Sequence, residues 1–147
     1  MSRAGTKYIE VHMALDLSGL EKAVKSFEEA VDYSNNLPEN IAADIVRDSV
    51  IQRFEYTYEL GWKLLQRWIK LNIGPEEAEP RTKKDLFRLA AKKNLIDDPS
   101  PWFEFSEARN QVARTYNEKN AKYVYDVAIK FLPAVKVLLK ELEQNND

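Results

Sequence analysis

The amino-acid sequence predicts an all-α protein, an antiparallel, up-and-down bundle of four or five helices. Apolar residues recur at helical spacing over most of the chain, and residues 47–68 carry two adjacent apolar stripes, which implies a long helix with two packed neighbours. Only 4 glycines and 6 prolines interrupt the 147 residues, as expected for long helices joined by few turns. The length suits one domain, so we expect a single helical domain over residues 17–147 after an N-terminal extension of residues 1–16.

The composition excludes several kinds of site. The chain has no cysteine, so disulfides, thiolate catalysis and cysteine-ligated metal centres are ruled out, and His12 is its single histidine. A Ser-His-Asp triad or a multi-histidine metal site would have to use this one residue, which lies in an unpatterned segment. We therefore expect neither a metal nor a cofactor. The formal net charge of −2 also argues against nucleic-acid binding through an overall positive field.

Nothing in the sequence indicates a membrane location. No apolar run reaches the about 18 residues that a membrane span requires, and the N-terminus lacks an uninterrupted apolar stretch after its basic start. The sequence therefore predicts no membrane span, no signal peptide and a cytoplasmic location.

The first helix is predicted to run from Ser18 to about Tyr33. Ser18 is a suitable N-cap residue, and Glu21 three residues later completes a capping box ahead of an apolar series. Residues 34–38 are predicted to form a turn because they combine serine, asparagine and proline. The sequence before Ser18 has no sustained period.

The central helix is predicted to reach about Leu71. Outside its apolar stripes it has a polar face, which should meet water or a polar partner, and in which Glu59 and Lys63 have the i,i+4 spacing and order that stabilises a helix. Gly61 costs about 1 kcal/mol relative to alanine inside a helix, so we expect it to let another helix backbone come close. The two stripes are Val50, Phe54, Gly61, Leu64 and Trp68, and Ile51, Tyr58, Trp62, Leu65 and Ile69; the polar face is Asp48, Gln52, Glu55, Glu59, Lys63, Gln66 and Lys70.

A third helix, predicted over residues 82–94 with Thr82 as its N-cap, has a strongly basic outer face. Asp85 is the one acidic residue that opposes six cations. Such a face is either simply solvated or a contact for anions or nucleic acid, because phosphates attract lysine and arginine. The sequence leaves both alternatives open. The cations are Arg81, Lys83, Lys84, Arg88, Lys92 and Lys93.

Two further helices are predicted from their first residues. Ser100 and Pro101 suit the N-cap and the first helical position of the fourth helix. The last helix begins near Asn117. Pro133 should kink it, because a proline removes one backbone hydrogen bond in mid-helix.

Arg109 is the anomalous residue of the fourth helix. At about 100° per residue it falls within about 40° of Trp102 and Ala113, on the apolar side, where an unpaired guanidinium would be costly. It therefore needs a carboxylate, a carbonyl, a partner chain or a phosphate beside it. On one continuous helix Arg109 and Arg114 point about 140° apart, so they cannot grip one small ligand unless the helix ends between them or a second subunit supplies one of them. Asn110 and Arg114, at i and i+4, are neighbours on one face.

Two stretches of the chain resemble one known family. The first is Arg47-Asp48 followed by Ile51-Gln-Arg-Phe-Glu-Tyr-Thr-Tyr-Glu-Leu-Gly-Trp-Lys-Leu-Leu65, and the second is Arg109-Asn-Gln-Val-Ala-Arg-Thr-Tyr-Asn-Glu118. The first resembles the signature helix of the nucleotidyltransferase substrate-binding proteins, the HepT-like branch of the HEPN helical superfamily, which usually has alanine at the Gly61 position. The second resembles the HEPN signature of Arg-Asn, three variable residues, His, one residue and Tyr. The resemblance covers about residues 18–142.

The second stretch departs from the ribonucleases of that superfamily at one position. Where those relatives have histidine, this chain has Arg114. The resemblance implies an arginine for phosphate and a histidine for proton transfer, and an arginine, with a pKa above about 12, cannot exchange a proton at neutral pH. We therefore expect no catalytic residue, and a site for an anion formed by Arg109, Asn110 and Arg114.

Tyr116 has two interpretations. It is either an aromatic residue packed at the helix end, with its hydroxyl in solvent, or a modification site. The second interpretation comes from the resemblance, because in toxin-like relatives the tyrosine of this motif accepts AMP from a partner nucleotidyltransferase.

The sequence favours a function without catalysis. We expect a substrate-binding or regulatory partner subunit of a small, separately encoded nucleotidyltransferase, as in an antitoxin–toxin-like pair. The resemblance also implies a homodimer, and contact with a nucleotide or RNA stays open. Two alternatives remain: an endoribonuclease toxin of the HEPN kind, and a helical protein-association module without a ligand.

Overall fold

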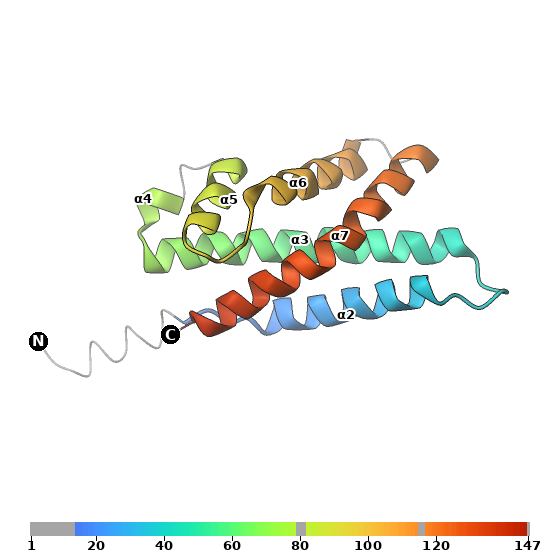
Figure 1. Cartoon of the computed structure of the whole chain (residues 1–147), viewed down its shortest axis with the longest axis horizontal. Helices are drawn as coiled ribbons and strands as arrows, with labels where there is room; N and C mark the ends of the chain where they lie inside the picture. The colour runs from blue at the N-terminus through green and yellow to red at the C-terminus, as the bar shows by residue number, and fades with distance from the viewer. Residues whose placement is uncertain (1–13, 79–81, 115–116, 147) are drawn as a thin grey trace, which may run out of the picture.

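The computed structural model describes residues 14–78, 82–114 and 117–146, which contain helices and no strand. The helices are α2 Ser18–Asn35, α3 Ala43–Asn72, α4 Pro75–Ala78, α5 Lys83–Lys92, α6 Pro99–Arg114 and α7 Glu118–Gln144. The four long helices α2, α3, α6 and α7 alternate in direction (Figure 1), and the short helices α4 and α5 connect α3 to α6. The predicted all-α class and up-and-down bundle are confirmed.

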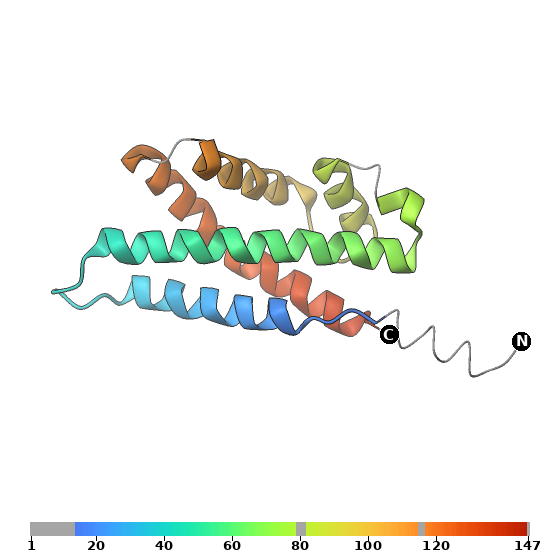
Figure 2. The same ribbon diagram turned by 180° about the vertical axis from the view of Figure 1, so that it is seen from behind.

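Helix α3 is the central element of the bundle. It contacts α2, α4, α5 and α7, and its 30 residues make it about 45 Å long. Figure 2 shows it along the whole molecule, with α2 on one side and α5 and α6 on the other. Both predicted apolar stripes point into the core, although Trp62 and Trp68 are only half-buried. The prediction of two packed neighbours is therefore confirmed.

Aromatic rings from all four long helices meet in the middle of the core. Phe131 of α7 lies at the centre, with its ring centroid 5.2 Å from that of Phe54, 5.5 Å from that of Trp102 and 5.0 Å from that of Phe105. All three pairs are edge-to-face, an arrangement worth about 0.5–1.5 kcal/mol beyond the burial of area. Phe27 of α2 completes the cluster. These contacts fix α6 against α3 and α7.

The predicted cap Thr82 is present, and Asn117, near which the last helix was predicted to begin, also acts as a cap. The Thr82 hydroxyl accepts a hydrogen bond from the backbone N–H of Asp85 at 3.2 Å, and the Asn117 side chain accepts one from the backbone N–H of Asn120 at 3.0 Å. Each satisfies a donor that the first turn of a helix leaves without an internal partner. The predicted starts of α5 and α7 are confirmed.

The predicted caps Ser18 and Ser100 are wrong. Ser18 is already the first residue of α2, and α6 begins at Pro99. Instead, an aspartate two residues before each serine accepts its backbone N–H, Asp16 for Ser18 and Asp98 for Ser100, both at 3.0 Å. A carboxylate is the stronger acceptor, and hydrogen bonds from Ser18 lower the pKa of Asp16.

Gly61 lies buried against α7, but no helix backbone approaches it. A Cβ atom at this position would lie 3.6 Å from Cδ2 of Leu138 and 3.9 Å from Cγ2 of Val135, which is ordinary van der Waals contact with side chains. The expectation that Gly61 permits a close backbone approach is therefore wrong, because an alanine would fit. Helix α7 continues through Pro133, and the predicted kink there stays a prediction.

The first described residues belong to the core. Leu15 and Leu17 are buried, and the side chain of Asn146 bonds to both backbone groups of Leu15. Residues 1–13, which include His12, lie outside the described residues. The division into an extension of residues 1–16 and a domain of residues 17–147 stays a prediction.

Candidate functional site

The first part of the candidate site is built around Arg109 of α6. Its Nε atom lies 3.6 Å from Oε2 of Glu55 and 3.6 Å from Oε1 of Glu59, and all three side chains are between 27% and 30% exposed. The sequence required a carboxylate, a carbonyl, a partner chain or a phosphate beside this guanidinium. The structure places carboxylates there. They come from the polar face of α3, which at this point meets a polar partner of the same chain.

This ion cluster places two carboxylates beside one guanidinium, and the exposed Lys63 pairs with one of the carboxylates. One guanidinium faces two carboxylates, and at 3.6 Å the contacts are ion pairs rather than hydrogen bonds. The pKa of Glu55 is raised, and burial is the largest cause. The Arg109 charge lowers this pKa, and the neighbouring Glu59 raises it. The Arg109 Nε atom is itself buried without a hydrogen-bond partner in the described structure. The Nε–H group of Arg109 could therefore still donate a hydrogen bond.

Glu59 connects Arg109 to the surface of α5. The other oxygen of Glu59 accepts a hydrogen bond from Nε1 of Trp62 at 3.3 Å, and Lys83 places its Nζ atom 4.6 Å from the centroid of the Trp62 ring. Lys63 pairs with Glu59 at 3.7 Å, which confirms the predicted i,i+4 pair. A series of polar contacts thus runs from α6 across α3 to α5.

Tyr58 forms the buried floor beside this cluster. Its ring is fully buried against Trp102, with 6.5 Å between the ring centroids. Burial raises the pKa of Tyr58 to about 12, which the nearby Ser106 hydroxyl only partly offsets. The hydroxyl is therefore neutral at pH 7, and Tyr58 is a core residue.

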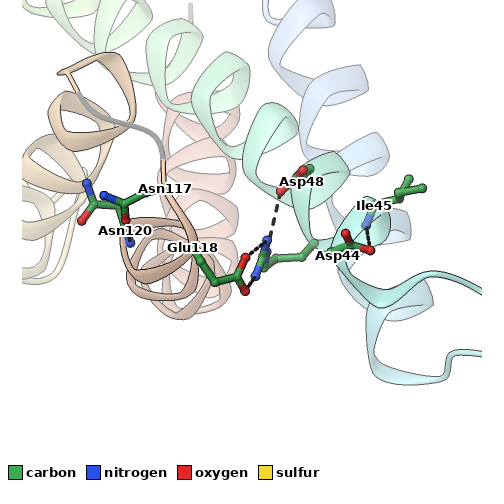
Figure 3. Close-up of polar contacts among 7 residues, drawn as sticks. Asp44, Ile45, Asp48, Asn117, Glu118 and Asn120 are labelled. Carbon is green, nitrogen blue, oxygen red and sulfur yellow. Dashed lines mark hydrogen bonds and ion pairs between the residues drawn. The ribbon is translucent and has the colours of Figure 1, made fainter.

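The second part of the candidate site joins the beginnings of α3 and α7. Arg47 binds the carboxylate of Glu118 with two hydrogen bonds, of 2.7 Å from one terminal nitrogen and 3.2 Å from the other. The Arg47 Nε atom also lies 3.6 Å from Oδ1 of Asp48, and Figure 3 shows Glu118 and Asp48 at the dashed lines that mark these contacts. The hydrogen bonds from Arg47 lower the pKa of Glu118. The ion pair fixes Glu118, which follows the cap residue Asn117 and is the first residue of α7.

A cavity of about 410 Å³ lies beside the Arg47–Glu118 pair. It is at the end of the bundle where α2 ends and where α3 and α7 begin (Figure 1). Its wall includes the hydroxyls of Ser34 and Tyr125, which are 2.9 Å apart, and the carboxylate of Asp44. The full lining is Ser34, Leu37, Ala43, Asp44, Arg47, Glu118 and Tyr125.

The predicted site residues are placed as follows. Arg109 lies in the carboxylate cluster, and Asn110 is exposed on α6. Arg114 is the last residue of α6, its side chain is outside the described structure, and Tyr116 lies outside the described residues. Because α6 is continuous from Arg109 to Arg114, the helix does not end between the two arginines. Only a second subunit could then bring both guanidinium groups to one small ligand.

The sequence motifs contained the residues of both ion clusters, but not their pairing. Arg47 and Glu118 are 71 positions apart, and both belong to the stretches that resemble the family. Glu55 and Glu59 were assigned only to the polar face of α3. Their relation to Arg109 could have been suspected from the anomalous position of that arginine, which required a carboxylate or a similar partner.

The fold and the site together define a class of protein. It is a helical bundle in which the central helix is joined by two ion clusters to the segment 109–118. The described residues contain no group of three or more histidine, aspartate or glutamate side chains placed to hold a metal ion. None of the described helices has the length and apolar character that crossing a membrane requires.

The chain belongs to the family described as nucleotidyltransferase substrate binding protein like, whose model matches residues 15–144. Over 138 residues it is 30% identical to the probable ribonuclease HepT of Haemophilus influenzae, which covers 90% of this chain and 94% of the relative. A solved Haemophilus influenzae structure, described as revealing the fold of a substrate binding domain of a nucleotidyltransferase, matches with a TM-score of 0.77 and 30% identity, over 88% of this chain and 100% of that one. A solved structure from Thermus thermophilus matches with a TM-score of 0.66 and 27% identity, over 84% of this chain and 98% of that one. The resemblance inferred from the two motifs is confirmed.

Proposed function

We propose that this protein is the non-catalytic partner subunit of a small, separately encoded nucleotidyltransferase, and that it binds the substrate or regulates the catalytic subunit in the cytoplasm. One observation carries the proposal: the two family motifs are joined by the Arg109 cluster at one point and by the Arg47–Glu118 pair at another. The two contacts hold both ends of the segment 109–118. The family description, and the solved relative described as a substrate binding domain, support the same function.

In this proposal Arg109, Asn110 and Arg114 bind an anion, and Tyr116 is the candidate acceptor of an AMP group. A phosphate could replace a carboxylate beside Arg109, because burial already disfavours the charged form of Glu55 and the Arg109 Nε atom has no hydrogen bond in the described structure. The two arginines lie on one continuous helix, so the anion site is completed by the second subunit of a homodimer.

The test is the substitution Arg109→Ala, measured by calorimetry against AMP, ATP and a small nucleotidyltransferase from the same organism. We expect the binding free energy to fall by about 1.5–3 kcal/mol, the range for a charge-assisted hydrogen bond. Arg109→Lys should recover only part of the loss, because an ammonium group cannot make the bidentate contact. Arg67→Ala, which removes an exposed guanidinium from α3, is the matched control and should have little effect.

Each variant must first show the circular dichroism and the molecular mass of the parent protein. If a correctly folded Arg109→Ala protein binds every nucleotide and the nucleotidyltransferase as the parent does, the anion site is wrong. If the parent binds none of them, the association module without a ligand becomes the better interpretation.

The name of the relative, probable ribonuclease, favours a second candidate function, an endoribonuclease. Arg114 argues against it, because a guanidinium cannot transfer a proton at neutral pH. We expect the purified protein to leave labelled RNA intact in the presence of EDTA, as seen on a denaturing gel. Metal-independent cleavage that disappears in Arg109→Ala would establish the second candidate in place of the first.

A further inference from the structure

We propose that the cations of α5 and of its C-cap form a separate binding surface for the phosphate backbone of a polynucleotide. This surface, called here the α5 basic face, does not include Arg109, and the proposal is independent of the function proposed above. It consists of Lys83, Lys84, Arg88, Lys92 and Lys93, together with the ring of Phe103 on α6.

The first argument is the segregation of charge. Residues 83–93 contain five cations and one carboxylate, that of Asp85, whereas the whole chain has a net charge of −2. A positive field of this kind extends over about 8–10 Å at physiological salt, so it acts on a polyanion that touches α5 and is not cancelled by distant acidic residues. The local charge is therefore available to a contacting ligand despite the acidic composition.

The second argument is that most of these cations have no carboxylate partner within the described structure. Arg88 pairs with Asp85 at 2.8 Å, but in the described part of the chain no carboxylate pairs with Lys83, Lys84 or the two lysines at 92–93. The ion pairs that join different helices, such as Arg47 with Glu118, are used to hold the bundle together. In the described structure the cations of the α5 basic face make no such ion pair with another helix.

The third argument concerns the aromatic rings beneath the cations. Lys84 Nζ and Arg88 Cζ lie 5.6 Å and 5.2 Å from the ring centroid of Phe103, and Lys83 lies over Trp62. These cation–π contacts order the side chains before a ligand arrives, which lowers the entropy lost on binding. The rings are covered by cations, so they are not free to stack on bases. The surface should therefore bind phosphates without regard to base sequence.

The test uses a fluorescent 2′-O-methyl RNA of about 20 nucleotides, a length above the about 16 that the largest single-stranded sites of one domain occupy. Fluorescence anisotropy follows its binding from about 50 mM to about 200 mM salt. A probe lacking the 2′-hydroxyl resists cleavage, so any nuclease activity does not affect the result. The parent should bind with an affinity that falls linearly with salt on a logarithmic scale.

The variant combines Lys84→Ala, Lys92→Ala and Lys93→Ala, and its matched control combines Lys25→Ala, Lys122→Ala and Lys140→Ala, all exposed lysines of α2 and α7. We expect the α5 variant to bind at least about 10-fold more weakly at about 50 mM salt, and the salt slope to shrink by about 2, since each phosphate contact on a single strand contributes about 0.7. The control should stay within about 2-fold of the parent.

Three outcomes would overturn the proposal. The parent could fail to bind the probe at about 50 mM salt, or the α5 variant and the control could lose equal affinity, which would indicate a general charge effect. A poly-glutamate peptide could also bind as tightly as the RNA and with the same loss in the variant, which would make the surface a contact for an acidic protein. If double-stranded DNA bound in place of the RNA, the phosphate-backbone surface would be supported. Its ligand would then be a duplex.

Discussion

Arg109 and its two carboxylates set the electrostatics around the candidate site. Glu55 and Glu59 share a half-buried region between α3 and α6 with Arg109, and the exposed Lys63 pairs with Glu59 only. Burial makes the charged form of Glu55 the less favoured one and raises its pKa. The stability of the protein should therefore depend on the protonation of Glu55 when the pH is changed.

We expect Glu55→Gln to stabilise the protein at neutral pH and not at acidic pH. A carboxyl group whose pKa is raised on folding favours the folded state at low pH, and that contribution is lost as the pH rises through the folded-state pKa. Glutamine stays neutral throughout, so the variant should gain stability near about pH 7, and the gain should disappear below about pH 4, near the unfolded-state value. Thermal unfolding at both pH values measures this gain in stability. The control is Glu39→Gln, a substitution of an exposed residue. A gain of equal size at both pH values would contradict this origin.

The sequence could predict the need of Arg109 for a partner, but not the partner itself. Its place on the same side of the helix as Trp102 and Ala113 follows from the rotation of about 100° per residue, which any helix imposes. The identity of the partner depends on which part of the polar face of α3 is turned toward α6. That rotation is decided by the packing of rings such as Phe131, which involves residues far apart in sequence.

At the scale of elements, the helices begin at acidic acceptors more often than the sequence suggested. Asp16 and Asp98 each accept the backbone N–H of the serine two residues later in a charge-assisted hydrogen bond, so each serine lies inside the first turn and not at the cap. Choosing between two neighbouring acceptors requires the local backbone geometry. The existence of each helix follows from its period, whereas the residue at which it begins does not.

The environment of Gly61 predicts a stabilising substitution in α3. Gly61→Ala should raise the free energy of unfolding by about 0.8–1 kcal/mol, because alanine is the better helix former and its Cβ would meet only side chains at ordinary distances. Urea denaturation measures the change. Gly74→Ala is the contrasting control: its φ is 152° and an added Cβ would lie 2.6 Å from Oε1 of Glu76, so it should destabilise. A destabilised Gly61→Ala protein would show that the contact with Leu138 is already too tight.

At the scale of the whole molecule, the order of the helices was predictable and their mutual contacts were not. Turns rich in asparagine and proline separate periodic segments, so the number and direction of the long helices follow from local signals. The meeting of Arg47 with Glu118 requires α7 to return beside the beginning of α3, which no local pattern specifies. Family resemblance identified both segments as important, and the structure shows that they touch.

We expect the protein to be a homodimer that buries part of α3 and the region 109–116. The reason is that Arg109 and Arg114 diverge on one continuous helix, so a shared anion site needs both subunits. Light scattering at micromolar concentration should give a mass of about twice the 17.1 kDa of the chain. A monomer under these conditions would remove the shared site and the role assigned to Arg114.

The contact between Leu15 and Asn146 has a consequence for protein engineering. The Asn146 side chain accepts a hydrogen bond from the Leu15 N–H at 2.8 Å and donates one to the Leu15 carbonyl at 2.9 Å, so both ends of the bundle domain lie side by side. They lie at the opposite end of the bundle from the beginnings of α3 and α7, which carry Arg47 and Glu118 (Figure 1). Reporters fused beyond Leu15 and beyond Asn146 would therefore sit next to each other without covering the candidate site. A short linker could also join the two ends, which makes the domain suitable for circular permutation.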